Sequence, residues 1–152
     1  MTQPPGVRLL RDPAGVDWDT LRAHLIEDDF DNGRSPEQLA ASFAASAHVV
    51  LAVTDVGGVV IGTARMLSDG ICNAYLVDVW TRVHWRRRGV ATSMVTDLLE
   101  RVPGQHVALF TDQPPAFYAR LGFEVERGAM SRVAGTWLRP APAAPDRPLV
   151  LP

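Results

Sequence analysis

The chain has 152 residues, 47% of them hydrophobic and 21% charged, which is typical of one soluble globular domain. Its net charge of −2 argues against a general nucleic-acid binder, because neutralising phosphates requires a broad excess of cations. The single cysteine, Cys72, excludes an internal disulfide framework and a cysteine metal cluster. With no secretory signal pattern and no apolar run of membrane-spanning length, we expect a cytoplasmic protein without membrane contacts.

The first half of the chain predicts a strand, two helices and a β-meander. Val7–Leu10 reads as a strand, and Asp17 or Asp19 can cap a first helix. Ser35, followed by Pro36 and Gln38, is a clear start for a second helix. Strands are then expected at 48–54, 59–66 and about 73–81, with turns at 55–58 and 68–70.

The second half predicts a long helix followed by mixed elements. The helix runs from about Val90 to Arg101, and Pro103-Gly104 ends it. We expect a strand at 106–111, a short helix at 116–121, and two closing strands at 123–126 and 131–138. Residues 139–152 are rich in Pro and Ala, which favours an irregular tail. Residues 1–138 thus form a single α+β layered domain.

A cationic turn connects the third meander strand to the long helix. It contains Arg86-Arg87-Arg88-Gly89, and the helix begins at Val90. Free backbone N–H groups, the helix dipole and a glycine that admits a ligand close to the main chain together favour an anion. The turn therefore predicts a phosphate-bearing ligand.

Two motifs carry a resemblance to a known family. Arg86-Arg87-Arg88-Gly89-Val90-Ala91 matches the Arg/Gln-x-x-Gly-x-Gly/Ala signature of the GNAT (GCN5-related) N-acetyltransferases, and 117–123, Phe-Tyr-Ala-Arg-Leu-Gly-Phe, resembles their Tyr-x-x-x-Gly-Phe element. The resemblance covers roughly Val7 to Leu138. It implies the GNAT fold, with a central mixed, mostly antiparallel sheet of about seven strands flanked by about four helices. It also implies acetyl-CoA as co-substrate and no metal.

The resemblance assigns the coenzyme site. In such proteins the strand before the turn binds the pantetheine arm by its backbone, and the turn wraps the pyrophosphate. The residues expected to bind the coenzyme are Val79, Trp80, Thr81, Arg86, Arg87, Arg88, Gly89, Val90, Ala91, Thr92, Thr111 and Tyr118. Two positions depart from the family: Thr111 stands where Asn is frequent, and Val83 where many members have proline.

The implied activity moves an acetyl group from acetyl-CoA directly to a primary amine of a small molecule or peptide, within a ternary complex. Tyr118 matches the family tyrosine that protonates the departing thiol. The base, or its water relay, stays open between Asp78, Tyr75, Asn73 and a water chain to backbone carbonyls. Strand alternation would place Asp78 on the opposite face from Val77, Val79 and Thr81. The N–H of Val79 or Thr81 would hold the oxyanion.

The acceptor is expected at the acidic loop after the first helix. Asp28, Asp29 and Asp31, with Phe30 between them, would suit a cationic amine with an apolar portion, and Asn73 would contact it from the strand. The alternative is a solvated loop that caps Arg34 and Ser35.

Two other functions compete with the enzyme. One is a non-catalytic acyl-CoA sensor, and the other is an RNA or polyphosphate binder built on the arginines, which the net acidity disfavours. The 131–138 strand could also pair across a homodimer.

Overall fold

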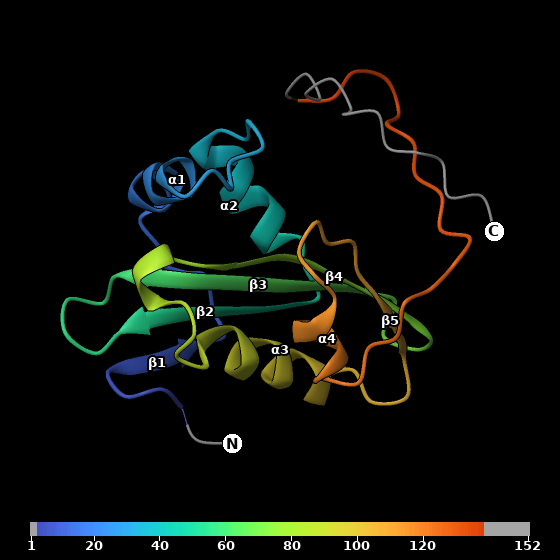
Figure 1. Ribbon diagram of the computed structural model, residues 1–152. Helices are drawn as coiled ribbons and strands as arrows, with labels where there is room; N and C mark the ends of the chain where they lie inside the picture. The colour runs from blue at the N-terminus through green and yellow to red at the C-terminus, as the bar shows by residue number, and fades with distance from the viewer. Residues whose placement is uncertain (1–2, 139–152) are drawn as a thin grey trace.

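The computed structural model describes residues 3–138, which form one sheet with helices on both faces (Figure 1). The strands lie in chain order across the sheet: β1 (Val7–Leu10), β2 (His48–Thr54), β3 (Val60–Ser68), β4 (Asn73–Thr81) and β5 (His106–Ala108). Adjacent strands are antiparallel except β4 and β5, which are parallel. The mixed, mostly antiparallel sheet is confirmed. The tail expected at 139–152 lies outside the described residues.

Two helices cover each face of the sheet. Figure 1 shows α1 (Trp18–Glu27) and α2 (Pro36–Ala44) on one face, and α3 (Val90–Glu100) and α4 (Ala116–Ala119) on the other. A short 3-10 turn, η1 (Val83–Trp85), connects β4 to the approach of α3. None of the helices within residues 3–138 combines the length and the apolar character needed to cross a membrane.

The expected helix starts are confirmed by their caps. The Asp17 carboxylate accepts a hydrogen bond from the Thr20 N–H at 3.0 Å, so Asp17 rather than Asp19 is the cap of α1. At α2 the Ser35 hydroxyl accepts from the Gln38 N–H, and the Gln38 side chain accepts from the Ser35 N–H. These caps satisfy backbone donors that a helix start leaves unpaired.

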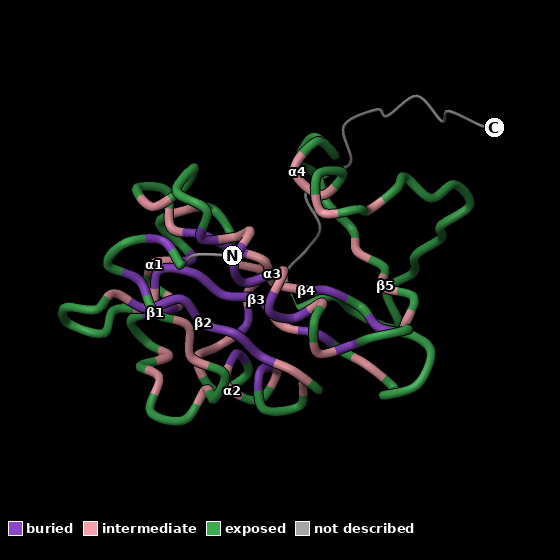
Figure 2. The backbone as a smooth tube through the Cα atoms, turned by 90° about the horizontal axis from the view of Figure 1, so that it is seen from below, coloured by how far each residue is buried: buried purple, intermediate pink, exposed green. Residues whose placement is uncertain are grey.

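The core lies mainly between the sheet and α3. Val90, Met94, Val95 and Leu98 of α3 are buried against residues of β2, β3 and β4 (Figure 2). Gly62 on β3 makes this close approach possible, because a Cβ there would lie only 2.9 Å from Met94 Cε and 3.2 Å from the Ala52 Cβ. The helix that follows the arginine turn is therefore held firmly on the sheet.

A β-bulge interrupts the pairing of β3 with β4. Arg65 lies opposite Val77 and Thr63 lies opposite Trp80, so β4 holds one more residue than β3 between these pairs. The bulge includes Asp78, whose φ of +54° is in the left-handed region that non-glycine residues seldom adopt. The Thr63 hydroxyl donates to the Asp78 carbonyl oxygen at 2.8 Å, a contact that joins the strands at the irregular point.

The strand count differs from the expectation of about seven, because neither closing strand forms. Residues 123–126 and 131–138 have no strand pairing, and every residue from Glu124 to Leu138 is exposed. The strand expected at 106–111 ends at Ala108. A strand forms only where a neighbouring edge offers hydrogen bonds, and three residues of β5 offer little edge. Figure 2 shows this segment standing away from the buried sheet.

Candidate active site

The turn before α3 presents an uninterrupted series of free backbone donors. Arg87 (φ +61°) and Gly89 (φ +83°) both adopt the left-handed conformation, and Gly89 is the N-cap of α3. Within residues 3–138, none of the N–H groups from Arg87 to Thr92 donates a hydrogen bond, whereas the next one, of Ser93, bonds the Gly89 carbonyl. Alternating left-handed residues and a helix start both create anion-binding concavities. The geometry suits a phosphate.

The arginine side chains of this turn have different surroundings. Arg86 turns back, and its Nε donates to the Thr81 carbonyl at 3.0 Å. The Arg88 guanidinium lies over the Trp85 ring, 5.1 Å from its centre. Arg87 is exposed. Arg86 therefore holds the turn in place, while Arg87 and Arg88 keep charge near its surface.

Beyond the first residues of β4, the edge facing β5 is free. The two strands pair only over Asn73–Tyr75 and His106–Ala108, so within the described chain β4 has no partner there from Leu76 to Thr81. The Arg82 N–H donates to the Ile61 carbonyl of β3 at 2.8 Å. Because N–H groups alternate in direction along a strand, the Thr81 N–H points toward the free edge. A ligand could extend β4 here by main-chain hydrogen bonds.

Tyr118 on α4 packs at the border of the α3-side core, as does Val79 of β4. Its ring meets Phe117 and Phe123 edge-on, at centroid distances of 4.9 and 5.7 Å. Burial raises the pKa of the Tyr118 hydroxyl above its ordinary value of 10.0. The group is therefore protonated at neutral pH, as a proton donor must be.

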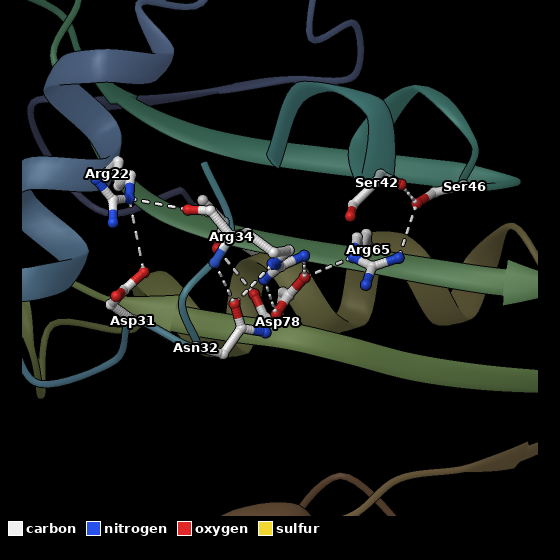
Figure 3. A network of polar contacts seen from close by, with 9 residues as sticks. Arg22, Asp31, Asn32, Arg34, Ser42, Ser46, Arg65 and Asp78 are labelled. Carbon is white, nitrogen blue, oxygen red and sulfur yellow. Dashed lines mark hydrogen bonds and ion pairs between the residues drawn. The ribbon is translucent and has the colours of Figure 1, made fainter. Parts of the chain in front are cut away.

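Asp78 lies on the face opposite Val79, as strand alternation predicts, but its carboxylate is buried in ion pairs and does not face a cleft or solvent. From Asp78 onward the strand alternates: Val79 packs in the α3-side core, and Trp80 packs with Leu21 and Leu39 on the other face. The Asp78 carboxylate points to that second face, where Arg34 donates both Nη groups to it at 2.9 and 2.8 Å and Arg65 donates Nε at 2.5 Å (Figure 3).

These contacts explain the acidity of Asp78. Burial alone would raise its pKa, but the hydrogen bonds and charges of Arg34, then of Arg65, outweigh burial and hold the pKa below the ordinary 3.8. A carboxylate engaged by two guanidinium groups is a poor proton acceptor. The position favours a structural role over the base considered from the sequence.

Tyr75 and Asn73 lie farther from the turn. Tyr75 pairs with Ala108 of β5, and its half-exposed ring meets Phe110 edge-on at 5.8 Å. Asn73 begins β4, about 26 Å from Thr81 at the usual rise per residue. Tyr75 therefore lies where β4 pairs with β5, and Asn73 lies at the opposite end of the strand from the turn.

The acidic loop after α1 is largely engaged within the protein. The Asp28 carboxylate accepts from Trp80 Nε1 and from the Val83 N–H, each at 3.0 Å. Asp31 lies 3.9 Å from Arg22. Asp29 (φ +57°) and Phe30 remain exposed. Asp28 therefore fixes α1 to the end of β4, which leaves Asp29 and Phe30 as the loop residues open to an acceptor.

Two of the coenzyme candidates can contribute only in part. The Trp80 side chain is buried, so only its backbone could face a ligand. The Thr111 hydroxyl lies beyond β5 and accepts from the Gln113 N–H. The part of the chain that the structure describes holds no group of three or more acidic, His or Cys side chains suited to a metal ion.

Sequence reasoning missed Arg34 and Arg65 as partners of Asp78. Arg34 is 7% exposed although it belongs to a loop. Arg65 falls on β3, in a strand that is otherwise mostly buried. A charged residue inside an apolar strand is the one signal that pointed to a buried partner.

Comparisons with known proteins identify the family and the fold. The model of the acetyltransferase (GNAT) family matches residues 10–123. A protein of Deinococcus radiodurans R1 assigned as an acetyltransferase shares 29% identity and a TM-score of 0.71, over 87% of this chain and 93% of that one. One of Xanthomonas campestris pv. campestris assigned to the same family shares 23%, with a TM-score of 0.72 over 87% and 96%.

A more distant similarity is to glucosamine-6-phosphate N-acetyltransferase of Arabidopsis thaliana, at 13% identity and a TM-score of 0.62, over 84% of this chain and 97% of that one. No curated protein matches the sequence. The family model spans most of the described domain, including the turn and Tyr118. The chain belongs to the GNAT family of acetyltransferases.

Proposed function

We propose that this protein is an N-acetyltransferase that moves the acetyl group of acetyl-CoA directly to a primary amine of a small molecule or peptide. The observation that carries the proposal is the series of N–H groups from Arg87 to Thr92, which have no acceptor within residues 3–138, beside the edge of β4 that has no strand partner there. The turn supplies donors for a pyrophosphate, and the edge supplies donors and acceptors for an amide-containing arm. Coenzyme A carries both groups.

In this proposal the Thr81 N–H stabilises the developing oxyanion. It points to the side of β4 that has no strand partner within the described residues, and its strand is held by the Arg82–Ile61 hydrogen bond. A preorganised backbone donor requires no reorganisation as charge develops on the carbonyl oxygen.

Two protons must move in the reaction. An alkylamine with a pKa near ~10 is about one part in a thousand neutral at pH 7, a cost of roughly 4 kcal/mol. We assign its proton to water rather than to Asp78, whose carboxylate is held by Arg34 and Arg65. Tyr118, protonated at neutral pH, donates to the departing thiolate.

Thermal melting tests coenzyme binding. Acetyl-CoA at a hundred times its dissociation constant should stabilise the fold by about 2.7 kcal/mol and raise the melting temperature by about 5–10 °C. An unchanged melting temperature at millimolar acetyl-CoA would sink the proposal.

A thiol-release assay across amines, amino acids, polyamines and aminoglycosides tests turnover. If the protein binds acetyl-CoA but releases thiol with none of these acceptors, the result would favour the non-catalytic acyl-CoA sensor. Tyr118→Phe should lower kcat by about a hundredfold while leaving the acetyl-CoA dissociation constant unchanged. Tyr75→Phe tests the alternative base, and an equal loss of kcat there would contradict the assignment of the amine proton to water.

The turn has its own test in Gly89→Val. A β-branched residue at φ +83° is strained, so the turn should rearrange and acetyl-CoA affinity should fall by about tenfold or more. Gly104→Val is the matched control, because Gly104 has a similar φ of +77° and open space around it but lies after α3. Normal affinity in Gly89→Val would refute the assignment of the turn.

A further inference from the structure

An acidic residue occupies the strained position of the β4 bulge, where glycine would be easiest to accommodate. Asp78 has a φ of +54°, and Asn or Asp tolerates this conformation better than other side chains. Its carboxylate is 12% exposed and lies against two guanidinium groups. The strained backbone and the buried ion pairs therefore coincide at one residue, beside the unpaired edge of β4.

The two arginines that hold Asp78 come from the loop between α1 and α2 and from β3. Arg34 stands in the loop that leads into α2, where its Nε donates to the Asn32 side chain and its carbonyl accepts from Arg22. Arg65 comes from β3, donates to the Ser46 hydroxyl after α2, and lies over the Phe43 ring. Figure 3 shows Arg34 and Arg65 converging on Asp78, with Arg22, Asn32 and Ser46 around them.

The cluster is also unbalanced in charge. One carboxylate faces two guanidinium groups, all with side chains between 9 and 12% exposed. Removing the carboxylate would leave two like charges close together and poorly solvated. The bulge, the loop before α2 and the end of α2 are therefore coupled through Asp78.

We infer that Asp78 is a positioning residue. With Arg34 and Arg65 it fixes the conformation of the β4 bulge and so orients the Val79–Thr81 backbone toward the thioester. It also holds the loop between α1 and α2 (residues 28–35) against the bulge. This inference rests on the proposed acetyltransferase function. Asp78 would affect turnover and not coenzyme binding. The turn that binds the pyrophosphate begins after the bulge, and it has its own support in the Arg86–Thr81 contact. Coenzyme affinity should depend on the turn, and turnover on the cluster.

The test compares Asp78→Asn and Asp78→Gly with Asp97→Asn. Both Asp78 variants tolerate the left-handed backbone but lack the charge, so kcat should fall by about tenfold or more while the acetyl-CoA dissociation constant stays within about threefold. Asp97 is a second carboxylate between two arginines, on α3, and its variant should keep the wild-type kcat. Formate should partly restore kcat in Asp78→Gly, because it can replace the lost carboxylate.

A measurement that needs no turnover keeps this inference separate from the proposed function. Amide hydrogen exchange at Trp80 and Arg82 should accelerate in Asp78→Asn by about tenfold or more, and should stay unchanged in Asp97→Asn. A wild-type protein that neither binds nor uses acetyl-CoA would refute the proposed function alone. Unchanged exchange, or a folded Asp78→Asn with wild-type kcat, would overturn the positioning role.

Discussion

Two clusters in this protein each contain one carboxylate and two arginines, and they lie on opposite faces of the sheet. On the face covered by α1 and α2, Asp78 lies between Arg34 and Arg65. On the α3 side, Asp97 lies between Arg11 and Arg101, each at 2.6 Å. In both, one buried carboxylate joins distant parts of the chain. Only the backbone and the solvent around them differ.

This difference gives the two clusters different roles: the Asp97 cluster attaches a helix to the sheet, and the Asp78 cluster positions a segment of backbone. Asp97 lies in a regular helix, Arg11 is 66% exposed, and Arg101 also donates to the Val49 carbonyl, so the cluster fastens α3 to β1 and β2. Asp78 lies in a left-handed bulge with both partners nearly buried. Exposed charges can exchange protein contacts for water, and buried ones cannot.

The largest expected contrast is in stability. Asp78→Ala should cost about 3–5 kcal/mol, because two buried guanidinium groups lose their anion and alanine is strained at a positive φ. Asp97→Ala should cost about 1–3 kcal/mol, since its arginines reach solvent. Urea unfolding of both variants measures the difference. Equal losses would show that burial does not distinguish the two clusters.

Acid should weaken the Asp78 cluster next. The pKa of Asp78 in the folded protein lies below 3.8, the value for a free side chain. Its stabilisation is therefore present above pH 3.8 and is lost as the pH falls through the folded-state value. Between pH 5 and pH 2.5, the wild type should lose more unfolding free energy than Asp78→Asn. If the unfolding free energies of the wild type and Asp78→Asn fell in parallel with pH, the lowered pKa of Asp78 would be contradicted.

The smallest effect should come from Arg11→Ala. Arg11 is largely exposed and Arg101 still holds Asp97, so the urea midpoint should stay close to wild type. Arg34→Ala is its counterpart in the other cluster and should lower the midpoint clearly, because Asp78 would keep only Arg65. A larger shift for Arg11→Ala would reverse the comparison.

Local signals predicted much of this fold. The Ser35–Gln38 capping box and the Asp17 cap mark helix starts through contacts within four residues, so the sequence contains all of the information. The turn around Gly89 is equally local, since a strand, a glycine and an apolar helix follow one another. Such features need no knowledge of distant partners.

The features that sequence missed all depend on distant partners. The closing strands at 123–126 and 131–138 have a suitable pattern, but pairing requires an edge that β5 does not extend to them. The bulge at Asp78 lacks the glycine that usually marks a bulge. Its aspartate is held by Arg34, which lies 44 residues away in the sequence. Alternation correctly placed Asp78 opposite Val79, but it could not identify the two arginines that hold its carboxylate.

Gly62 shows how a residue that does not touch a ligand can still affect the ligand's binding site. It lies on β3 opposite Thr81 and outside the turn itself, and its missing side chain lets Met94 and the rest of α3 pack against the sheet. Any side chain there must displace the helix or its methionine by some tenths of an ångström. Where the helix moves, the N–H groups at its start shift with it, so a mutation in the sheet could alter coenzyme affinity without any change in the groups that touch the coenzyme.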